Sequence, residues 1–363
     1  MLHFKVIFAT PQDGAVANDI IDIFVLSWFY KFLVLNMIFE FTAASGFDFL
    51  TLFAAQNNVL VRGDVLEIPK TLGEGYVRRV GFGSEFKLTI HRYVLKEDLI
   101  IKRNPATQAN DVRTFFFYSN RENFDFKYNS EENIPFSQKN DSSIMVSTND
   151  LRSEIRFPAG SNIQYVVVGI TAGKLNSILS LQNPNTILQT ILKKDASFLF
   201  FENLDTEMQL LLKNIVSVDM NNFLNGFYVQ IKVQELMYLL FSKLALREAT
   251  TFKNINSNDA EKLLVIRNKI LADLSTPPLI SDLAALASMS ETKLKQLFKQ
   301  TFGDTIYSYY QKARMEEAAF LLKQAKHSVS QVGYELGFSN LSHFSRLFEK
   351  QYGITPKKFS YTI

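Results

Sequence analysis

The chain has 363 residues, 47% of them hydrophobic, which is enough for two or three domains with sizeable cores. It contains no cysteine, which excludes disulfides, thiolate-zinc sites, cysteine nucleophiles and thiol redox sensing, and which agrees with a cytoplasmic location. The net charge of +3 is unevenly distributed: residues 260–363 hold 14 Lys and Arg against 9 Asp and Glu, a balance of 14 − 9 = +5 that leaves 3 − 5 = −2 elsewhere. Such a surplus is typical of contact with nucleic-acid phosphates, although many solvated helical domains share it.

Residues 20–39, IIDIFVLSWFYKFLVLNMIF, form the most apolar window, close to the ~20 residues of a membrane-spanning helix. Asp22 and Lys31 argue against a span, because a lysine near its middle costs about 2.5–3.5 kcal/mol. The preceding residues lack the basic start and cleavage site of a signal peptide. We therefore favour a buried element over a membrane anchor. Because a β-rich domain begins naturally at MIFEFTAASGF, we treat residues 1–36 as a dispensable extension, with Met37 as an alternative translation start.

Residues 37–180 contain short β-branched and aromatic runs separated by turn residues, including EFKLTIHRYV, RTFFFYSN and NIQYVVVGITA. Several short strands of this kind predict an antiparallel sandwich or barrel, which we expect to be a sensor domain. Five side chains are candidates for lining a pocket, although core and surface positions explain them more simply: Tyr93, Arg113, Phe117, Arg156 and Tyr165.

The sequence offers little for metal or cofactor chemistry. No two of its four histidines are spaced for coordination on one element. Gly81 and Gly83 form only G-x-G, without the third glycine and acidic partner of a dinucleotide site. A phosphate-binding lysine motif and a nucleophile elbow are also missing. We therefore predict no cofactor, no metal and no enzymatic activity.

Residues 181–250 are predicted to be helical, with the longest pattern in GFYVQIKVQELMYLLFSKLALRE. This helix is apolar over much of its circumference, so one flank can pack against the β-rich domain and another against a second copy. We predict a homodimer through this segment, with packing within one chain as the alternative. The polar stretch TFKNINSND, residues 251–259, is the predicted interdomain linker.

One pattern occurs twice in residues 260–363, as ISDLAALASMSETKLKQLFKQTFGDT and again as VSQVGYELGFSNLSHFSRLFEKQYGIT. Each copy has a short apolar-periodic helix, a break, and a helix whose apolar residues recur at three and four, which is helix-turn-helix spacing. Ser290 and Ser339 can cap the second helices, and Gly337 can adopt the left-handed conformation that ends the helix before it.

The outward faces of the two second helices are polar. They carry Thr292, Lys293, Lys295, Gln296 and Lys299 in the first unit and Asn340, Leu341, Ser342, Ser345, Arg346 and Lys350 in the second. Amides, hydroxyls and Arg can pair with base edges, Leu341 can meet a thymine methyl group, and Lys can meet phosphates. Arg346 is the strongest single candidate, and a phosphate contact is the more common role for such an arginine.

Residues 305–324 between the units, TIYSYYQKARMEEAAFLLKQ, predict a helix about 30 Å long at 1.5 Å per residue. Successive major-groove faces repeat at ~34 Å, so this spacer can place both second helices on one side of a duplex. A helical bundle without DNA affinity is the alternative. It does not explain the repeated pattern, the capped breaks and the polar outer faces.

The segments SDLAALASMS, ARMEEAAFLL and GYELGFSNLSHFSRLFEKQYGITPKKF resemble the AraC/XylS transcription regulators over residues 260–363. The resemblance implies a seven-helix domain that places the second helix of each unit in the major groove, contacts RNA polymerase and usually activates transcription. It implies base reading by Thr292, Lys295 and Gln296, and by Leu341, Ser342, Ser345 and Arg346. The chain departs from the family at Gly333, where Ala is common, and at Thr292 and Gln296, so we expect weaker or different readout by the first unit.

The predicted fold class is α+β multidomain: a β-rich sandwich and a helical dimerisation segment, followed by an all-α domain with two helix-turn-helix units. The N-terminal half more loosely resembles cupin-like sensors, through GYVRRVGFG and IRFPAG. The leading hypothesis is a cytoplasmic activator that binds double-stranded DNA and a small-molecule effector. A regulator controlled by a protein partner, with no small-molecule ligand, is the alternative. An appended DNA-repair methyltransferase would need an acceptor cysteine, which the chain lacks.

Overall fold

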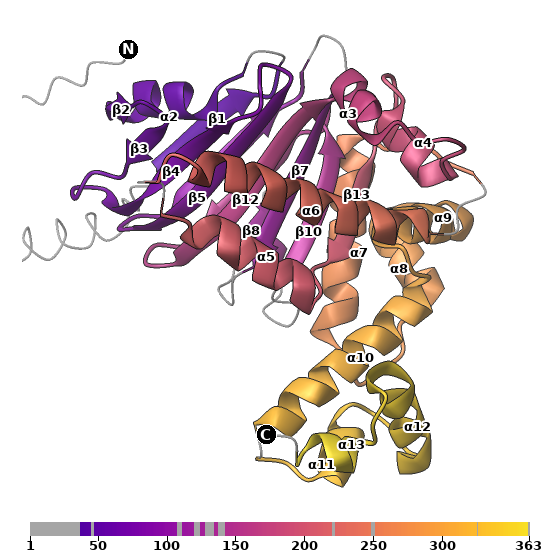
Figure 1. Cartoon of the computed structure of the whole chain (residues 1–363). Coiled ribbons are helices and arrows are strands. Elements are labelled where there is room, and N and C mark those ends of the chain that lie inside the picture. The colour runs from indigo at the N-terminus through magenta and orange to yellow at the C-terminus, as the bar shows by residue number, and fades with distance from the viewer. Residues whose placement is uncertain are drawn as a thin grey trace, which may run out of the picture. The chain divides into compact units, whose positions relative to one another are not determined.

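The computed structural model describes residues 37–44, 47–106, 111–119, 124–127, 134–136, 142–219, 222–247, 251–324 and 326–361. The predicted extension at residues 1–36 lies outside these ranges, together with most of the apolar window. Within them, no helix is both long enough and apolar enough to cross a bilayer. Residues 37–363 form one compact unit, in which a β-rich half (residues 37–247) precedes a helical C-terminal domain (residues 257–361) (Figure 1).

Two sheets form the β-rich half. In the described residues the larger sheet has the order β13-β10-β7-β12-β5-β4-β3-β2, and the smaller has the order β1-β6-β11-β8-β9. Strands β1 and β6 pair in parallel, and the other paired strands are antiparallel. The strands are β1 (Met37–Thr42), β2 (Val61–Arg62), β3 (Val65–Glu67), β4 (Gly73–Gly81), β5 (Phe86–Leu95), β6 (Leu99–Asn104), β7 (Val112–Ser119), β8 (Phe124–Lys127), β9 (Ile134–Phe136), β10 (Ser142–Thr148), β11 (Ser153–Phe157), β12 (Asn162–Thr171) and β13 (Leu199–Asn203). This arrangement confirms the predicted β-rich fold.

The larger sheet has two buried faces, because successive side chains of a strand point to opposite sides. Helices α5 (Thr206–Ser217) and α6 (Asn225–Ala245) lie across one face (Figure 1), where Leu88 and Ile90 of β5 join their core. The opposite face meets the smaller sheet in an aromatic cluster that includes Phe39, Tyr93 and Tyr165. The cavity between the sheets is therefore lined by strand side chains that point to this opposite face, such as Lys87, Thr89 and His91 of β5.

The remaining helices of the β-rich half are short. They are α2 (Phe49–Asn57), α3 (Ala172–Leu179) and α4 (Thr186–Leu192). The prediction that residues 181–250 are helical is wrong at Leu199–Asn203, because this segment forms β13 and pairs with β10. Periodicity does not distinguish a five-residue segment such as LFFEN, with only three apolar residues, from a turn of buried helix, so only its partner strand identifies it.

Within residues 257–324 and 326–361 the C-terminal domain contains the seven helices implied by the family resemblance. They are α7 (Ser257–Ala272), α8 (Ile280–Ala287), α9 (Glu291–Phe302), α10 (Ile306–Lys323), α11 (Val329–Glu335), α12 (Leu341–Tyr352) and α13 (Pro356–Phe359). Helix α10 separates the two helix-turn-helix units, as predicted, and has 18 residues. Arg314 of α10 is buried, donates to the main-chain oxygen of Leu336 at 3.1 Å, and lies 3.6 Å from the Phe338 ring centroid. This arginine fixes the second unit to α10.

The segment between the two parts of the chain is held on both sides. Helix α7 begins inside the predicted linker, because the side chain of Asn256 accepts from the backbone N–H of Asp259 at 2.8 Å and caps it. The N–H of Ile255 donates to Ser197 in the β-rich half at 3.0 Å. The N–H of Lys253 donates to the Gln300 side chain in α9 at 2.9 Å. The segment is therefore an ordered connection with partners in both parts.

Candidate nucleic-acid interface

The first helix-turn-helix unit consists of α8 and α9. Helix α8 ends at Ser288 in the left-handed conformation, with φ of 49°. Ser290 caps α9 as predicted, since its side chain accepts from the N–H of Lys293 at 3.3 Å. Leu294 and Phe298 are buried on the inner face of α9. The local sequence therefore sets both the turn and the buried face of this unit.

The second unit consists of α11 and α12, and its cap differs from the prediction. Asn340, not Ser339, caps α12, and its side-chain oxygen accepts from the N–H of His343 at 3.1 Å. Gly337 ends the turn with φ of 77°, as predicted, and a Cβ there would lie 1.9 Å from the main-chain oxygen of Ser275. The Asn340 oxygen is therefore occupied by capping, although we predicted this residue at the DNA surface.

Gly333 makes room for Leu341. A Cβ at position 333 would lie 2.6 Å from Leu341 Cδ2 and 3.3 Å from Phe344 Cδ1. The half-buried Leu341 side chain occupies the space that the Cβ of an alanine at position 333 would need. The absence of a side chain at Gly333 therefore allows Leu341 to pack between α11 and α12, and this part of the Leu341 surface is not available to DNA.

None of the eleven predicted DNA-contacting residues is fully buried. Exposed are Thr292, Lys295, Lys299, Asn340, Ser342, Arg346 and Lys350, and half-buried are Lys293, Gln296, Leu341 and Ser345. Ser342, Arg346 and Lys350 follow one another at intervals of four along α12, so they lie on one helix face. Neither Arg346 nor Lys350 forms an ion pair with the described residues. The outer face of α12 is open to a partner.

The outer face of α9 is partly occupied. Lys293 pairs with Asp259 of α7 at 2.8 Å, and Lys295 pairs with Glu291 at 2.9 Å. The Gln296 amide donates to Thr251 Oγ1 at 3.1 Å. Three of the five candidate side chains on this helix therefore have partners within the chain.

A groove of about 580 Å³ runs along this face of α9. One wall has Thr292, Lys295, Gln296 and Lys299, and the other includes Ile187 of α4 and Arg247. A recognition helix enters a major groove about 12 Å wide, with phosphates on both flanks. Here residues of the β-rich half form the facing wall, so one flank of α9 is covered in this arrangement.

Arg247 holds α9 against the β-rich half. Its Nε pairs with Glu202 at 2.7 Å, its Nη2 donates to the main-chain oxygen of Phe201, and its Nη1 donates to the main-chain oxygen of Gln300 at 3.1 Å. The rings of Phe201 and Phe302 stack beside it, with centroids 5.4 Å apart. This contact was not predictable from the sequence, because Arg247 only follows an apolar helix and its partners are more than 40 residues away.

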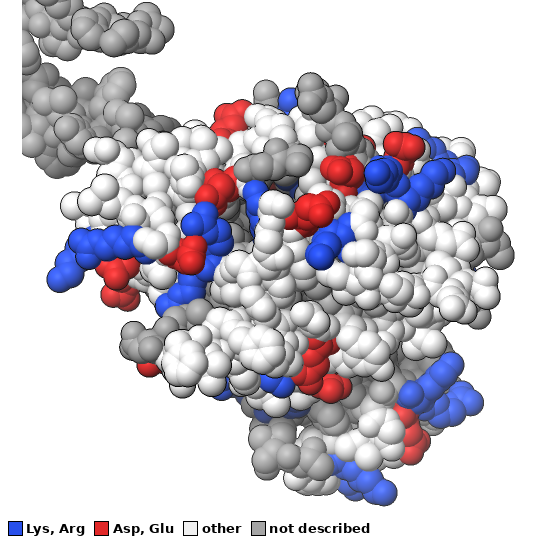
Figure 2. All heavy atoms as spheres, turned by 45° about the horizontal axis from the view of Figure 1, so that its top comes forward, with Lys and Arg blue, Asp and Glu red and all other residues white. Residues whose placement is uncertain are grey.

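Acidic and basic side chains are interspersed over the molecular face in Figure 2. Among the described residues, no group of three His, Cys, Asp or Glu could hold a metal ion.

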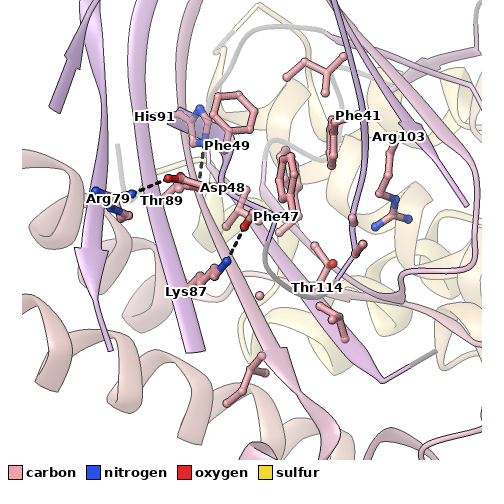
Figure 3. Close-up of a pocket in the computed structure, with 18 of the residues that line it drawn as sticks. Phe41, Phe47, Asp48, Phe49, Arg79, Lys87, Thr89, His91, Arg103 and Thr114 are labelled. Atoms are coloured by element: carbon pink, nitrogen blue, oxygen red, sulfur yellow. Dashed lines mark hydrogen bonds and ion pairs between the residues drawn. The ribbon is translucent and has the colours of Figure 1, made fainter. Parts of the chain in front are cut away.

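A separate cavity of about 170 Å³ lies between the two sheets (Figure 3). Of the five predicted lining residues only Tyr165 borders it. Arg113 instead donates to main-chain oxygens that include Ile191 at 2.8 Å, and Arg156 donates to Asp98 at 2.9 Å. Phe117 faces the other core, and Tyr93 meets Tyr165 through their hydroxyls, 3.1 Å apart. The alternation of side chains along a strand predicts which residues share a face of the sheet. It does not show which of the two faces lines a cavity.

Comparison with known proteins relates the C-terminal part of the chain to DNA-binding proteins. Residues 283–361 match the family model described as "Helix-turn-helix domain". The transcriptional activator RhaR of Escherichia coli is 30% identical over 129 residues, which cover 34% of this chain and 46% of RhaR. The alignment thus spans about half the length of that relative.

Two solved structures align more loosely. ToxT from Vibrio cholerae covers 77% of this chain and 99% of its own, with 15% identity and a TM-score of 0.29. A transcriptional regulator with an AraC-type DNA-binding domain from Chromobacterium violaceum covers 29% of this chain and 95% of its own, with 31% identity and a TM-score of 0.28.

Proposed function

We propose that this protein is an effector-responsive, sequence-specific activator of the AraC/XylS family, from the premise that its C-terminal domain matches a helix-turn-helix family model and part of the activator RhaR. The observation that carries the proposal is the open outer face of α12, where Ser342, Arg346 and Lys350 are aligned beside a fixed spacer helix. Arg346 contacts a phosphate or a base, and Lys350 contacts a phosphate. RhaR is a transcriptional activator, and the family resemblance implies that activation by this chain involves contact with RNA polymerase.

Helix α10 sets the spacing of the two units on DNA. Its 18 residues span about 27 Å at 1.5 Å each, close to the ~34 Å groove repeat. Arg267 of α7, the helix that precedes the first unit, donates to the Tyr309 hydroxyl of α10 at 2.8 Å, so α7 is also bound to α10. Both units therefore approach adjacent grooves of one duplex as a single body.

The docked position of α9 supports regulation of DNA binding by the β-rich half. One flank of α9 is covered by the β-rich half. The helix therefore reads DNA only after it separates from the wall that contains Ile187, and it then uses Thr292, Lys295, Gln296 and Lys299. An effector that favours the undocked arrangement raises affinity by increasing the fraction of competent molecules. The cavity between the sheets favours a small-molecule effector over control by a protein partner.

The exposed flank of α6 supports the homodimer. Phe227, Ile231 and Tyr238 are 63%, 47% and 68% exposed, and their spacing places them on one side of the helix. Apolar side chains in such a row are suited to a second copy of the same helix. Analytical ultracentrifugation with and without DNA checks this expectation, and a monomer at micromolar concentration in both would contradict it.

Selection of bound sequences from a random DNA pool tests the main proposal. We expect an enriched motif with two half-sites about one helical turn apart. A pool that stays random after selection, under conditions in which the protein is folded, would refute sequence-specific binding.

A further inference from the structure

We propose that the cavity between the two sheets binds a small carboxylate that carries one aromatic or apolar ring, and that Lys87 receives its carboxylate group. The inference rests on the effector-responsive function proposed above and names the chemical class of the effector. It depends on the size of the cavity, the residues of its walls and the pairing of its charged groups.

The walls suit a ring. Phe41 and Phe47 stack with centroids 4.5 Å apart, and Phe49 meets His91 edge-on at 4.7 Å. Tyr165 stacks against the His91 ring at 4.1 Å. An apolar cavity of about 150 Å³ holds benzene. The volume here, about 170 Å³, therefore accommodates one ring with a short substituent.

Among the cations in the walls, Lys87 is the best placed for an anionic ligand, because it is half-buried whereas Arg103 is buried, where a carboxylate would lose more of its hydration. Arg79 forms ion pairs with two aspartates, and Arg103 donates to Ser147 Oγ at 3.2 Å. The half-buried Lys87 ammonium donates to the neutral main-chain oxygen of Phe47 at 2.6 Å (Figure 3) and pairs with no carboxylate among the described residues. An ammonium has three donors, so two remain for a carboxylate.

The other titratable groups of the cavity do not oppose an anion at Lys87. Asp48 is paired with Arg79 at 2.6 Å, and Glu85 is exposed and accepts a hydrogen bond from a threonine at 3.0 Å. Burial lowers the pKa of His91 to about 3, so its ring is neutral near pH 7. The fully buried His91 Nδ1 has no hydrogen-bond partner among the described residues, which leaves a polar atom for a ring substituent.

The order of residues along the chain orients the ligand. Ser84 and Glu85 are exposed and border the cavity, whereas Lys87 and then Thr89 and His91 lie progressively further along β5. A carboxylate at Lys87 stays near the solvent, which limits the cost of its desolvation, while the ring reaches the aromatic walls.

Calorimetric titration of the full chain with phenylacetate and with its neutral isostere phenylacetamide tests the inference. We expect phenylacetate to bind about tenfold to a hundredfold more tightly, as one hydrogen bond to a charged group implies. Lys87→Met removes this preference and leaves phenylacetamide binding unchanged, whereas Lys87→Arg keeps the preference. Lys213→Met, at an exposed position of α5, serves as the matched control.

Equal affinity of the unaltered protein for the two compounds, or saturable binding of neither, would overturn the inference even where Lys87→Met does not fold. DNA binding without ligand is measured in parallel. A protein that binds DNA but does not discriminate the carboxylate refutes the ligand class alone. A protein that discriminates the carboxylate but selects no DNA sequence refutes the proposed function alone.

Discussion

Replacing Arg247 should release α9 from the β-rich half and strengthen binding to DNA that carries both half-sites. Among the three hydrogen bonds of its guanidinium, only the bond to the Gln300 oxygen reaches the C-terminal domain. A hydrogen bond to a charged group contributes about 1.5–3 kcal/mol. If docking excludes α9 from DNA, losing this bond raises the competent fraction, and therefore the affinity, by up to roughly tenfold to 150-fold.

The substitution is best made as Arg247→Met together with Glu202→Gln. The Glu202 side chain is only 16% exposed, and a buried carboxylate left without its partner would destabilise the β-rich half by itself. Fluorescence anisotropy then compares a duplex that carries both half-sites with one that carries only the site of α12. We expect tighter binding to the first duplex and unchanged binding to the second, because the outer face of α12 is already open.

A matched control is Arg156→Met with Asp98→Asn, another partly buried arginine pair, which lies in the smaller sheet and its adjoining turn. It should leave both affinities unchanged. The reasoning about docking is refuted if the Arg247 variant, with an unchanged melting temperature, binds both duplexes as the unaltered protein does. An equal loss of affinity for both duplexes would also refute it.

Three further outcomes are expected. Arg346→Ala weakens specific DNA binding by about 1–3 kcal/mol in a gel-shift titration, and Lys350→Ala lowers the salt slope of binding by about one; unchanged affinity would exclude Arg346 from the interface. Gly333→Ala lowers the free energy of unfolding by about 1–3 kcal/mol through overpacking, and adding Leu341→Ala recovers part of it in denaturant melts; additive losses would contradict this contact. Burial raises the pKa of Glu316 from 4.5 to about 7, so the folded state binds a proton more tightly than the unfolded state and loses stability as pH rises from about 4.5 to 7. Glu316→Gln should therefore flatten the fall in melting temperature between pH 5 and pH 8, and a pH profile unchanged by this substitution would contradict the role of Glu316.

Local signals predicted local structure well in this chain. Ser290, with Lys293 three residues later, was identifiable as a cap because capping depends on neighbours in sequence. In the second unit Ser339 and Asn340 are adjacent and both suit the position, so only backbone geometry decides between them.

Features that depend on distant partners were not predictable. Strand β13 is defined by its pairing with β10, which lies more than 50 residues earlier. The docking of α9 depends on Arg247 and Glu202, and the cavity depends on which strand faces meet across the sandwich. The outer face of α12 could be predicted because it follows from helical periodicity alone, whereas the occupied flank of α9 could not.

The buried guanidinium of Arg314 has a consequence for the promoters this protein would recognise. Since Arg314 joins α10 to the second unit, the two units cannot easily change their spacing or relative orientation to fit half-sites that are spaced differently. One inserted base pair turns a half-site by about a tenth of a helical revolution, roughly 35°. A regulator built in this way would tolerate substitutions within its half-sites more readily than insertions or deletions between them, so the gap length would be the most constrained feature of its target.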